Sequence, residues 1–296
     1  MSSNVVISRI KGGLGNQMFC YSAARRLSLV SSAELVIDNV TGFARDRLYK
    51  RTYMLDNFCI PARKATSAER LEPFERYRRG FLKLFYRSQP FYKRCYLEQV
   101  GLEYDERILS LKVKGKLYLD GLWQSEGYFK DVEHIIRRDL RICPPSDDFN
   151  KKIATKIRAS LSVAVHVRWF DDQSKEGEYN ISSEYYRRAL SLMEDKLPNP
   201  RYFIFSDHPE AARYKIKFPE DRTMFINHNR GDATAYADLW LMQQCKHFVT
   251  ANSTFSWWGA WLGTGEEKIV LTPSKKMEGK AAWGFRGLIP PEWTKV

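Results

Sequence analysis

The stretch RIKGGLGNQMFCYSAARRL, residues 9–27, places three glycines and an asparagine between an apolar run and a run with helical spacing. The apolar run at 4–11 predicts a buried strand, residues 17–30 predict a helix, and AELVIDN (33–39) predicts a second strand. A strand, a glycine corner, a helix and another strand are typical of a nucleotide-binding α/β unit. Glycine also lets the main chain approach a phosphate closely and point N–H groups at it, although a plain tight turn would use the same residues.

The chain has 296 residues, 44% of them hydrophobic, which predicts packed cores and favours two domains of roughly 150 residues. Its formal net charge of +13 predicts an anionic partner, which could be a nucleic acid, a phosphorylated metabolite or an acidic membrane. The five cysteines form no close pair, so we expect reduced, mostly buried thiols. With no signal-peptide pattern and no long apolar run, we expect a cytoplasmic protein.

The segment CPPSDDF (143–149) is the predicted linker, and it divides the chain into domains at 1–145 and 146–296. The α/β alternation resumes beyond it, which predicts two Rossmann-like halves. The predicted strands of the second half are LSVAVHVRW (161–169), RYFIFSD (201–207), HFVTANS (247–253) and KIVLTPS (268–274), and its predicted helices cover 182–197 and 233–245.

Residues 74–96, FERYRRGFLKLFYRSQPFYKRCY, contain seven basic residues, one acidic residue and eight aromatic residues. Apolar side chains recur at helical spacing opposite arginine and lysine, which predicts an amphipathic helix that is interrupted at Pro90. We expect either a helix packed on its own domain with a solvated charged side, or a helix that contacts a membrane peripherally. Nucleic acid is a third alternative for this segment.

Polar side chains follow three predicted strands of the second half, where α/β sheets bind ligands. His166 and Arg168 end the first strand, and the planar guanidinium suits a pyrophosphate, although an Arg–Asp ion pair would also explain it. Asp207 ends the second strand and would either cap the following helix or bind a hydroxyl. Asn252, Ser253 and Thr254 precede a helix, where they would be caps or an anion site. Three tryptophans follow, and we expect them in the core rather than stacked on sugar: Trp257, Trp258 and Trp261.

Taken together, these stretches resemble glycosyltransferase family 11, which includes bacterial and animal α-1,2-fucosyltransferases. The resemblance runs nearly end to end. Its motifs are GGLGNQMFCYSA (12–23), HVRWFD (166–171), FSDH (205–208) and NSTFSWWGAWL (252–262), with further landmarks in RTYMLDNF (51–58) and GLWQSEGYF (121–129).

The resemblance implies a GT-B fold, an α/β architecture of two Rossmann-like domains that face each other across a cleft. The N-terminal domain would lie on the acceptor side, and the C-terminal domain would bind GDP-β-L-fucose. The implied activity is that of a galactoside 2-α-L-fucosyltransferase, an inverting enzyme that moves fucose to the 2-hydroxyl of a galactose residue. No two aspartates are separated by a single residue, so we expect no metal cofactor.

The resemblance also implies roles for particular residues. Arg168 would clamp the pyrophosphate with help from Ser253 and Thr254, while Asn16 would lie nearest the reaction. Asp171 is the expected general base, with Asp172 and Glu176 as neighbours, although a transition state with little base assistance stays open. The remaining donor-binding residues that we expect are Gly12, Gly13, Gly15, His166, Asp207, Asp238 and Asn252.

Four residues depart from the family pattern, namely Cys20, Trp169, Phe170 and His208. Trp169 and Phe170 lie in the Arg168 loop, so the acceptor preference is left open. A lipid-linked surface glycan at the inner membrane of a bacterium is the expected acceptor. The alternatives are the same fold with another linkage or donor, and a non-catalytic basic module that binds polyanions or membranes. The chain shows no nucleic-acid motif that would support a nucleic-acid partner.

Overall fold

The computed structural model describes residues 4–170, 179–265 and 267–296. The chain divides into two compact units, the first made of residues 1–141 and 286–288 and the second of residues 142–285 and 289–296. Each unit is built on its own sheet, and every strand pairing in both sheets is parallel. None of the described helices has the length and hydropathy that spanning a bilayer requires.

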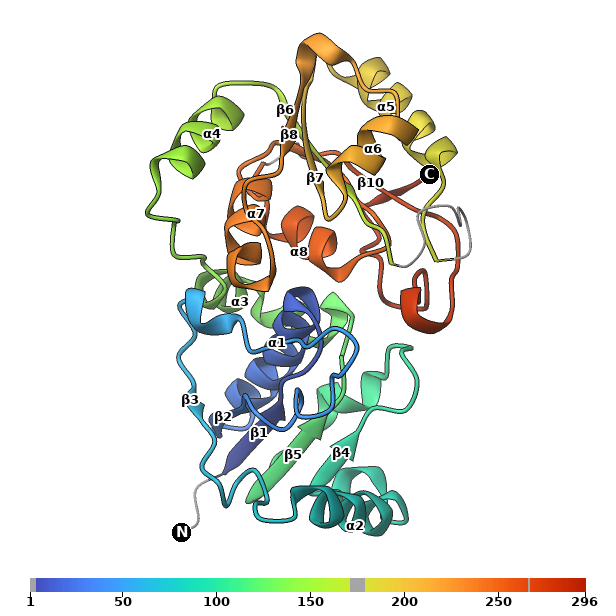
Figure 1. The fold of residues 1–296 in the computed structure, drawn as a ribbon. Helices are drawn as coiled ribbons and strands as arrows, with labels where there is room; N and C mark the ends of the chain where they lie inside the picture. The colour runs from blue at the N-terminus through green and yellow to red at the C-terminus, as the bar shows by residue number, and fades with distance from the viewer. Residues whose placement is uncertain (1–3, 171–178, 266) are drawn as a thin grey trace. The chain divides into compact units, whose positions relative to one another are not determined.

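The first unit contains a sheet with strand order β3-β2-β1-β5-β4 (Figure 1). Buried β-branched residues begin the central strand β1, and the helix α1 follows it directly. The strands are β1 (Val5–Arg9), β2 (Glu34–Asp38), β3 (Arg63–Lys64), β4 (Tyr96–Glu98) and β5 (Lys116–Asp120), and the helices are α1 (Leu14–Val30), α2 (Glu75–Arg87) and α3 (Glu133–Asp139).

The second unit contains a sheet with strand order β11-β10-β9-β6-β7-β8, and its central strand β6 is buried along its whole length. The strands are β6 (Ser162–Val167), β7 (Arg201–Ser206), β8 (Thr223–Ile226), β9 (His247–Val249), β10 (Val270–Thr272) and β11 (Thr294–Lys295). The helices are α4 (Asp148–Arg158), α5 (Ser183–Lys196), α6 (Pro209–Lys215), α7 (Ala235–Met242) and α8 (Thr254–Leu262).

Three expectations about local structure are corrected here. Helix α1 begins at Leu14, because Gly13 serves as its N-cap and the glycine corner already forms its first turn. The predicted linker is shorter than 143–149, because the Asp147 carboxylate caps α4 by accepting a hydrogen bond from the Asn150 N–H. The cysteines are not mostly buried, since only Cys20 and Cys245 are, and Cys59 and Cys143 are exposed.

Helix α2 lies the opposite way round from a helix packed on its own domain by its apolar side. Arg79 is 6% exposed and faces the sheet, whereas Phe81 is 68% exposed. The expectation of a solvated charged side above a packed apolar side is therefore wrong for the middle of this helix. The reason is that acidic residues at the strand ends offer ion-pair partners to the side chains of α2, Asp38 to Arg79 and both Glu98 and Asp120 to Lys83.

The tryptophans of α8 are in the core, as expected. Trp257 and Trp258 are fully buried, and Trp257 stacks on Trp261 with ring centroids 6.1 Å apart. A well-packed aromatic cluster of this kind fixes the direction of the helix and hence the position of its first residues.

Candidate functional site

The glycine corner of the first unit lies at the carboxyl end of β1, where α1 begins. Gly12 has a φ of +78°, and a Cβ atom there would lie 2.7 Å from Nδ2 of Asn16. Both the backbone and the space therefore require glycine at this position. Gly13 adopts an ordinary φ of −71° as the N-cap, and Gly15 and Asn16 belong to the first turn of α1.

Gln17, to which the sequence analysis assigned no role, holds this corner in place. Its buried side chain donates from Nε2 to the carbonyl oxygens of Gly12 at 2.9 Å and Thr52 at 2.8 Å. Its Oε1 accepts from the Met54 N–H at 2.9 Å. The neighbouring Asn16 accepts at Oδ1 from Nε2 of Gln124 at 2.7 Å. The two amides of the GGLGNQ motif thus tie the corner to segments far away in the sequence, which no local pattern announces.

In the second unit, Arg168 and Asp207 form an ion pair between the carboxyl ends of the neighbouring strands β6 and β7. Nη1 of Arg168 donates to Oδ2 of Asp207 at 2.5 Å, and the Trp169 N–H donates to Oδ1 at 3.1 Å. Burial raises the pKa of Asp207, while the Arg168 charge and the Trp169 hydrogen bond oppose this rise. Asp207 orients the guanidinium, and the expectation that it caps α6 is wrong, because no side chain caps that helix.

His166 lies two residues before Arg168 and is only 7% exposed. Its ring lies against Phe255, with centroids 5.4 Å apart, so the start of α8 is beside the end of β6. Burial, reinforced by the charge of Arg168, lowers the pKa of His166 to about 3. Nδ1 has no hydrogen-bond partner among the residues described. The imidazole is therefore neutral near pH 7 and has capacity for a hydrogen bond.

The start of α8 combines a cap with a buried amide. Ser253 is the N-cap, and its Oγ accepts from the Phe255 N–H at 3.3 Å, so capping is confirmed for this residue. Thr254 is the first helical residue. Asn252 is buried and donates from Nδ2 to the Tyr179 carbonyl at 3.0 Å, whereas its Oδ1 has no partner within the described part of the chain. A helix N-terminus next to an arginine favours an anionic group.

Asp238 on α7 belongs to a polar network that the sequence analysis missed. Its Oδ1 accepts from Nδ2 of Asn229 at 2.8 Å, and Nδ2 of Asn229 also lies 3.0 Å from Oδ1 of Asn150 on α4. His228 joins through Nε2, 2.9 Å from the same oxygen of Asn150. Burial raises the pKa of Asp238 to about 7, and the Asn229 hydrogen bond only partly opposes this. No sequence motif marks these residues, because they come from three separate segments.

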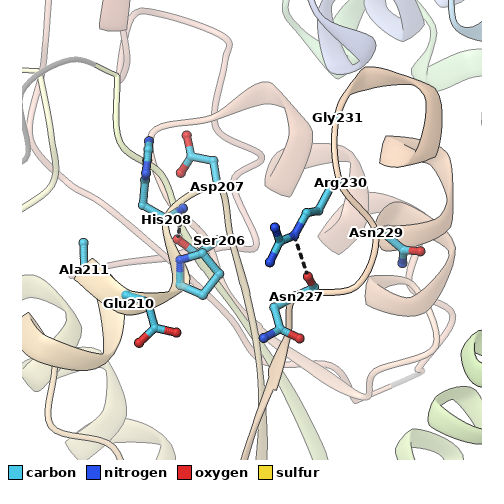
Figure 2. Close-up of a pocket in the computed structure, with 10 residues that line it drawn as sticks. Ser206, Asp207, His208, Glu210, Ala211, Asn227, Asn229, Arg230 and Gly231 are labelled. Atoms are coloured by element: carbon cyan, nitrogen blue, oxygen red, sulfur yellow. Dashed lines mark hydrogen bonds between the residues drawn. The ribbon is translucent and has the colours of Figure 1, made fainter.

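A cavity of about 510 Å³ lies between the segment that follows β7 and the segment that follows β8 (Figure 2). Asp207 lines it from the first segment, while Asn229 and Arg230 line it from the second. The Arg230 side chain reaches toward the middle of the cavity in Figure 2, and its Nε donates to the Asn227 carbonyl at 3.4 Å. Since Asn229 bonds Asp238, the predicted site residues Asp207 and Asp238 are linked through the wall of one cavity.

The predicted site residues thus fall into two groups. Gly12, Gly13, Gly15 and Asn16 lie together in the first unit, at the start of α1. His166, Arg168, Asp207, Asp238, Asn252, Ser253 and Thr254 surround the carboxyl ends of β6, β7 and β9 in the second unit. Asp171, Asp172 and Glu176, the expected base and its neighbours, lie outside the described residues.

Two parallel α/β units, one of which presents an arginine and a helix N-terminus at its strand ends, define a glycosyltransferase of the GT-B fold class. The model of glycosyl transferase family 11 matches residues 86–294, and the chain belongs to this family. This confirms the resemblance seen in the sequence.

Two Escherichia coli proteins are similar over almost the whole length. An alpha-1,2-colitosyltransferase is 29% identical, with 99% of both chains covered. The O-antigen biosynthesis glycosyltransferase WbnK is 29% identical, with 92% of this chain and 95% of its own covered. The structure of an Arabidopsis thaliana FUT1 mutant in complex with GDP shares the fold at a TM-score of 0.55 and 14% identity, covering 95% of this chain and 72% of that one.

Proposed function

We propose that the chain is an inverting α-1,2-fucosyltransferase that moves L-fucose from GDP-β-L-fucose to the 2-hydroxyl of a galactose residue in a glycan. The observation that carries this proposal is the Arg168 guanidinium at the end of β6, oriented by Asp207 and close in sequence to His166, which touches the start of α8. This arrangement offers fixed positive charge where a pyrophosphate would develop negative charge. The choice of fucose rests on the motifs shared with the α-1,2-fucosyltransferases of the family.

The chemistry proposed is a single displacement. The acceptor oxygen forms a bond to the anomeric carbon of fucose while the bond to the β-phosphate oxygen breaks, which inverts the configuration. Arg168 and the start of α8 stabilise the charge on the departing GDP, since preorganised donors act most strongly where charge appears. A carboxylate takes the acceptor proton, and Asp171 remains the residue proposed for this role.

The other predicted residues are assigned to donor recognition. His166 stays neutral near pH 7, so it offers a hydrogen bond without adding charge beside Arg168. Asp238 and Asn229 would recognise the guanosine part from the wall of the cavity. In the first unit, Gly12 exposes backbone and Asn16 extends from the first turn of α1. We propose that this corner approaches the sugar.

A second donor is supported by one specific observation. The alpha-1,2-colitosyltransferase covers 99% of this chain at 29% identity, and colitose differs from fucose by lacking the 3-hydroxyl group. A site that hydrogen-bonds that hydroxyl would reject colitose strongly, whereas a site that leaves it uncontacted would accept both sugars. GDP-colitose is therefore the alternative donor.

We further propose that transfer needs no metal ion, because the sequence has no pair of aspartates separated by one residue and Arg168 can supply positive charge. Incubation with EDTA tests this directly. Unchanged turnover is expected, and loss of turnover that returns with added Mn²⁺ or Mg²⁺ would refute it.

The decisive test is GDP release with GDP-fucose or GDP-colitose as donor and lactose or N-acetyllactosamine as acceptor, followed by linkage analysis of the product. The proposal expects GDP release that depends on acceptor and yields an α-1,2-linked fucoside. Faster turnover with GDP-colitose would establish the alternative donor. Release of no GDP with either donor and any galactose-terminated acceptor would contradict both.

A further inference from the structure

We propose that helix α2 docks the protein on an anionic lipid bilayer through a face that we call the aromatic face, made of Tyr77, Phe81, Leu84 and Phe85 and preceded by Phe74. This inference concerns an interaction surface, and it does not depend on which sugar or acceptor the enzyme uses.

The first observation is that the charges in the middle of α2 point inward. Arg79 donates from Nη2 to Oδ2 of Asp38 at 3.2 Å and to Oγ1 of Thr41 at 2.9 Å. Lys83 places Nζ 2.6 Å from Glu98 and 3.2 Å from Asp120. Ion pairs beneath the helix therefore hold it on the sheet, and its apolar side chains contribute little to that attachment.

The second observation is that the aromatic face is exposed. Phe81 is 68% exposed and Leu84 is 74% exposed, and Phe74 and Tyr77 are comparably open. The rings of Phe81 and Phe85 stack with centroids 6.2 Å apart, so the side chains form a continuous patch. Single exposed apolar residues are ordinary, but a contiguous apolar patch marks a surface that meets another apolar phase.

The charges around the aromatic face identify that phase. At 100° per residue, Arg76 and Arg87 lie along one edge of the face and Arg78 along the other, and all three are exposed. Aromatic and aliphatic side chains bordered by arginines suit the boundary between acyl chains and anionic headgroups. A second copy of the chain packed on the same face would bring arginines against arginines, which like-charge repulsion disfavours.

The place of α2 in its unit gives docking a use. Asp120 accepts from Lys83 of α2 and also from Lys11, 2.9 Å from Oδ1, and Lys11 immediately precedes Gly12. The aromatic face and the glycine corner thus belong to one rigid edge of the first sheet. On the proposed function, docking would hold this edge near an acceptor carried by a lipid. A location at the cytoplasmic face of a bacterial inner membrane remains part of this proposal.

The test is sedimentation of the full chain with phosphatidylcholine vesicles and with vesicles that also contain phosphatidylglycerol. We expect binding to the anionic vesicles only. Phe81→Ser combined with Leu84→Ser should lower the partition coefficient at least about tenfold, because the apolar contribution is lost. Arg76→Gln combined with Arg78→Gln should lower it roughly thirtyfold, since each basic residue near an anionic surface contributes about fivefold. Tyr214→Ser is the matched control, because Tyr214 is 91% exposed on α6, and its binding should be unchanged.

Equal binding of the wild type to both kinds of vesicle, or no binding to either, would overturn the proposal. So would anionic binding that the Phe81 and Leu84 variant retains in full. Analytical ultracentrifugation covers the remaining occupant, because a dimer that this variant dissociates would assign the face to a second copy. GDP release on a soluble acceptor is measured in parallel, so that failure of the proposed function and failure of docking are seen separately.

Discussion

Arg168 and Asp207 are joined by a 2.5 Å hydrogen bond between Nη1 and Oδ2, which connects the first residue after β6 to the first residue after β7. The other carboxylate oxygen accepts from the Trp169 N–H, so a single aspartate fixes both the guanidinium and the backbone beside it. An arginine held in this way loses little side-chain freedom when it binds an anion. The pair therefore acts as a preorganised charge rather than as a surface salt bridge.

Replacement of Arg168 by alanine should lower kcat with GDP-fucose roughly 100- to 1,000-fold, because a preorganised donor to the departing charge is removed. Steady-state GDP release measures this. Arg168→Lys should recover only part of the loss, since an ammonium group cannot reproduce the bidentate fork. Arg187→Ala is the matched control, because Arg187 is paired with Glu184 on the exposed side of α5 and should leave kcat unchanged. A kcat for Arg168→Ala within threefold of the wild type would contradict the assignment.

Asp207→Asn should lower kcat/KM by roughly tenfold, because the amide can still accept from Trp169 N–H but no longer holds the guanidinium by charge. The informative measurement is the double-mutant cycle. If Asp207 acts through Arg168, the double variant should be no less active than Arg168→Ala alone. Additive losses would show instead that Asp207 contacts the donor independently.

Gly12→Ala should destabilise the first unit by about 1 to 2 kcal/mol, since the left-handed backbone disfavours a Cβ atom. It should also reduce activity, because that atom would lie 2.7 Å from Nδ2 of Asn16 and displace the side chain. Gly13→Ala is the control, with an ordinary φ of −71° and no atom nearer than 4.0 Å. Urea unfolding and GDP release are both measured. Equal effects of the two substitutions would rule out the steric explanation.

Asp238→Asn should change how stability depends on pH. The folded-state pKa is raised from 3.8 to about 7, so between these values the folded chain binds more protons than the unfolded chain. Stability contributed by the protonated carboxyl is complete below about pH 4 and is lost as the pH rises toward 7. The asparagine variant avoids this loss, and its Tm relative to wild type should increase from pH 5 to pH 8. Asp195→Asn on α5, which is exposed, should show no such trend.

Much of the architecture was predictable, because it depends on local patterns. Buried runs such as SVAVHV gave strands, and a serine before an apolar helix gave the cap at Ser253. The orientation of α2 was not predictable in the same way. A helical wheel separates the apolar side from the charged side but does not say which side has partners, and here Asp38, Glu98 and Asp120 attract Arg79 and Lys83 inward.

The candidate site shows the same division. Arg168 and the glycine corner could be found from sequence because each follows a strand directly. The partner of Arg168 could not, since Asp207 lies 39 residues away and competes with the nearer aspartates of the following loop. The network of Asn150, Asn229 and Asp238 was equally hidden, because amides carry no charge pattern and their pairing exists only in three dimensions.

The three hydrogen bonds of Gln17 have a practical consequence for engineering. They bind the Gly12 carbonyl to the backbone at Thr52 and Met54, so the glycine corner and the irregular segment after β2 are built as one piece. Anyone who grafts that segment from a relative to obtain a new acceptor range should transplant it together with the corner, and retain the glutamine that joins them.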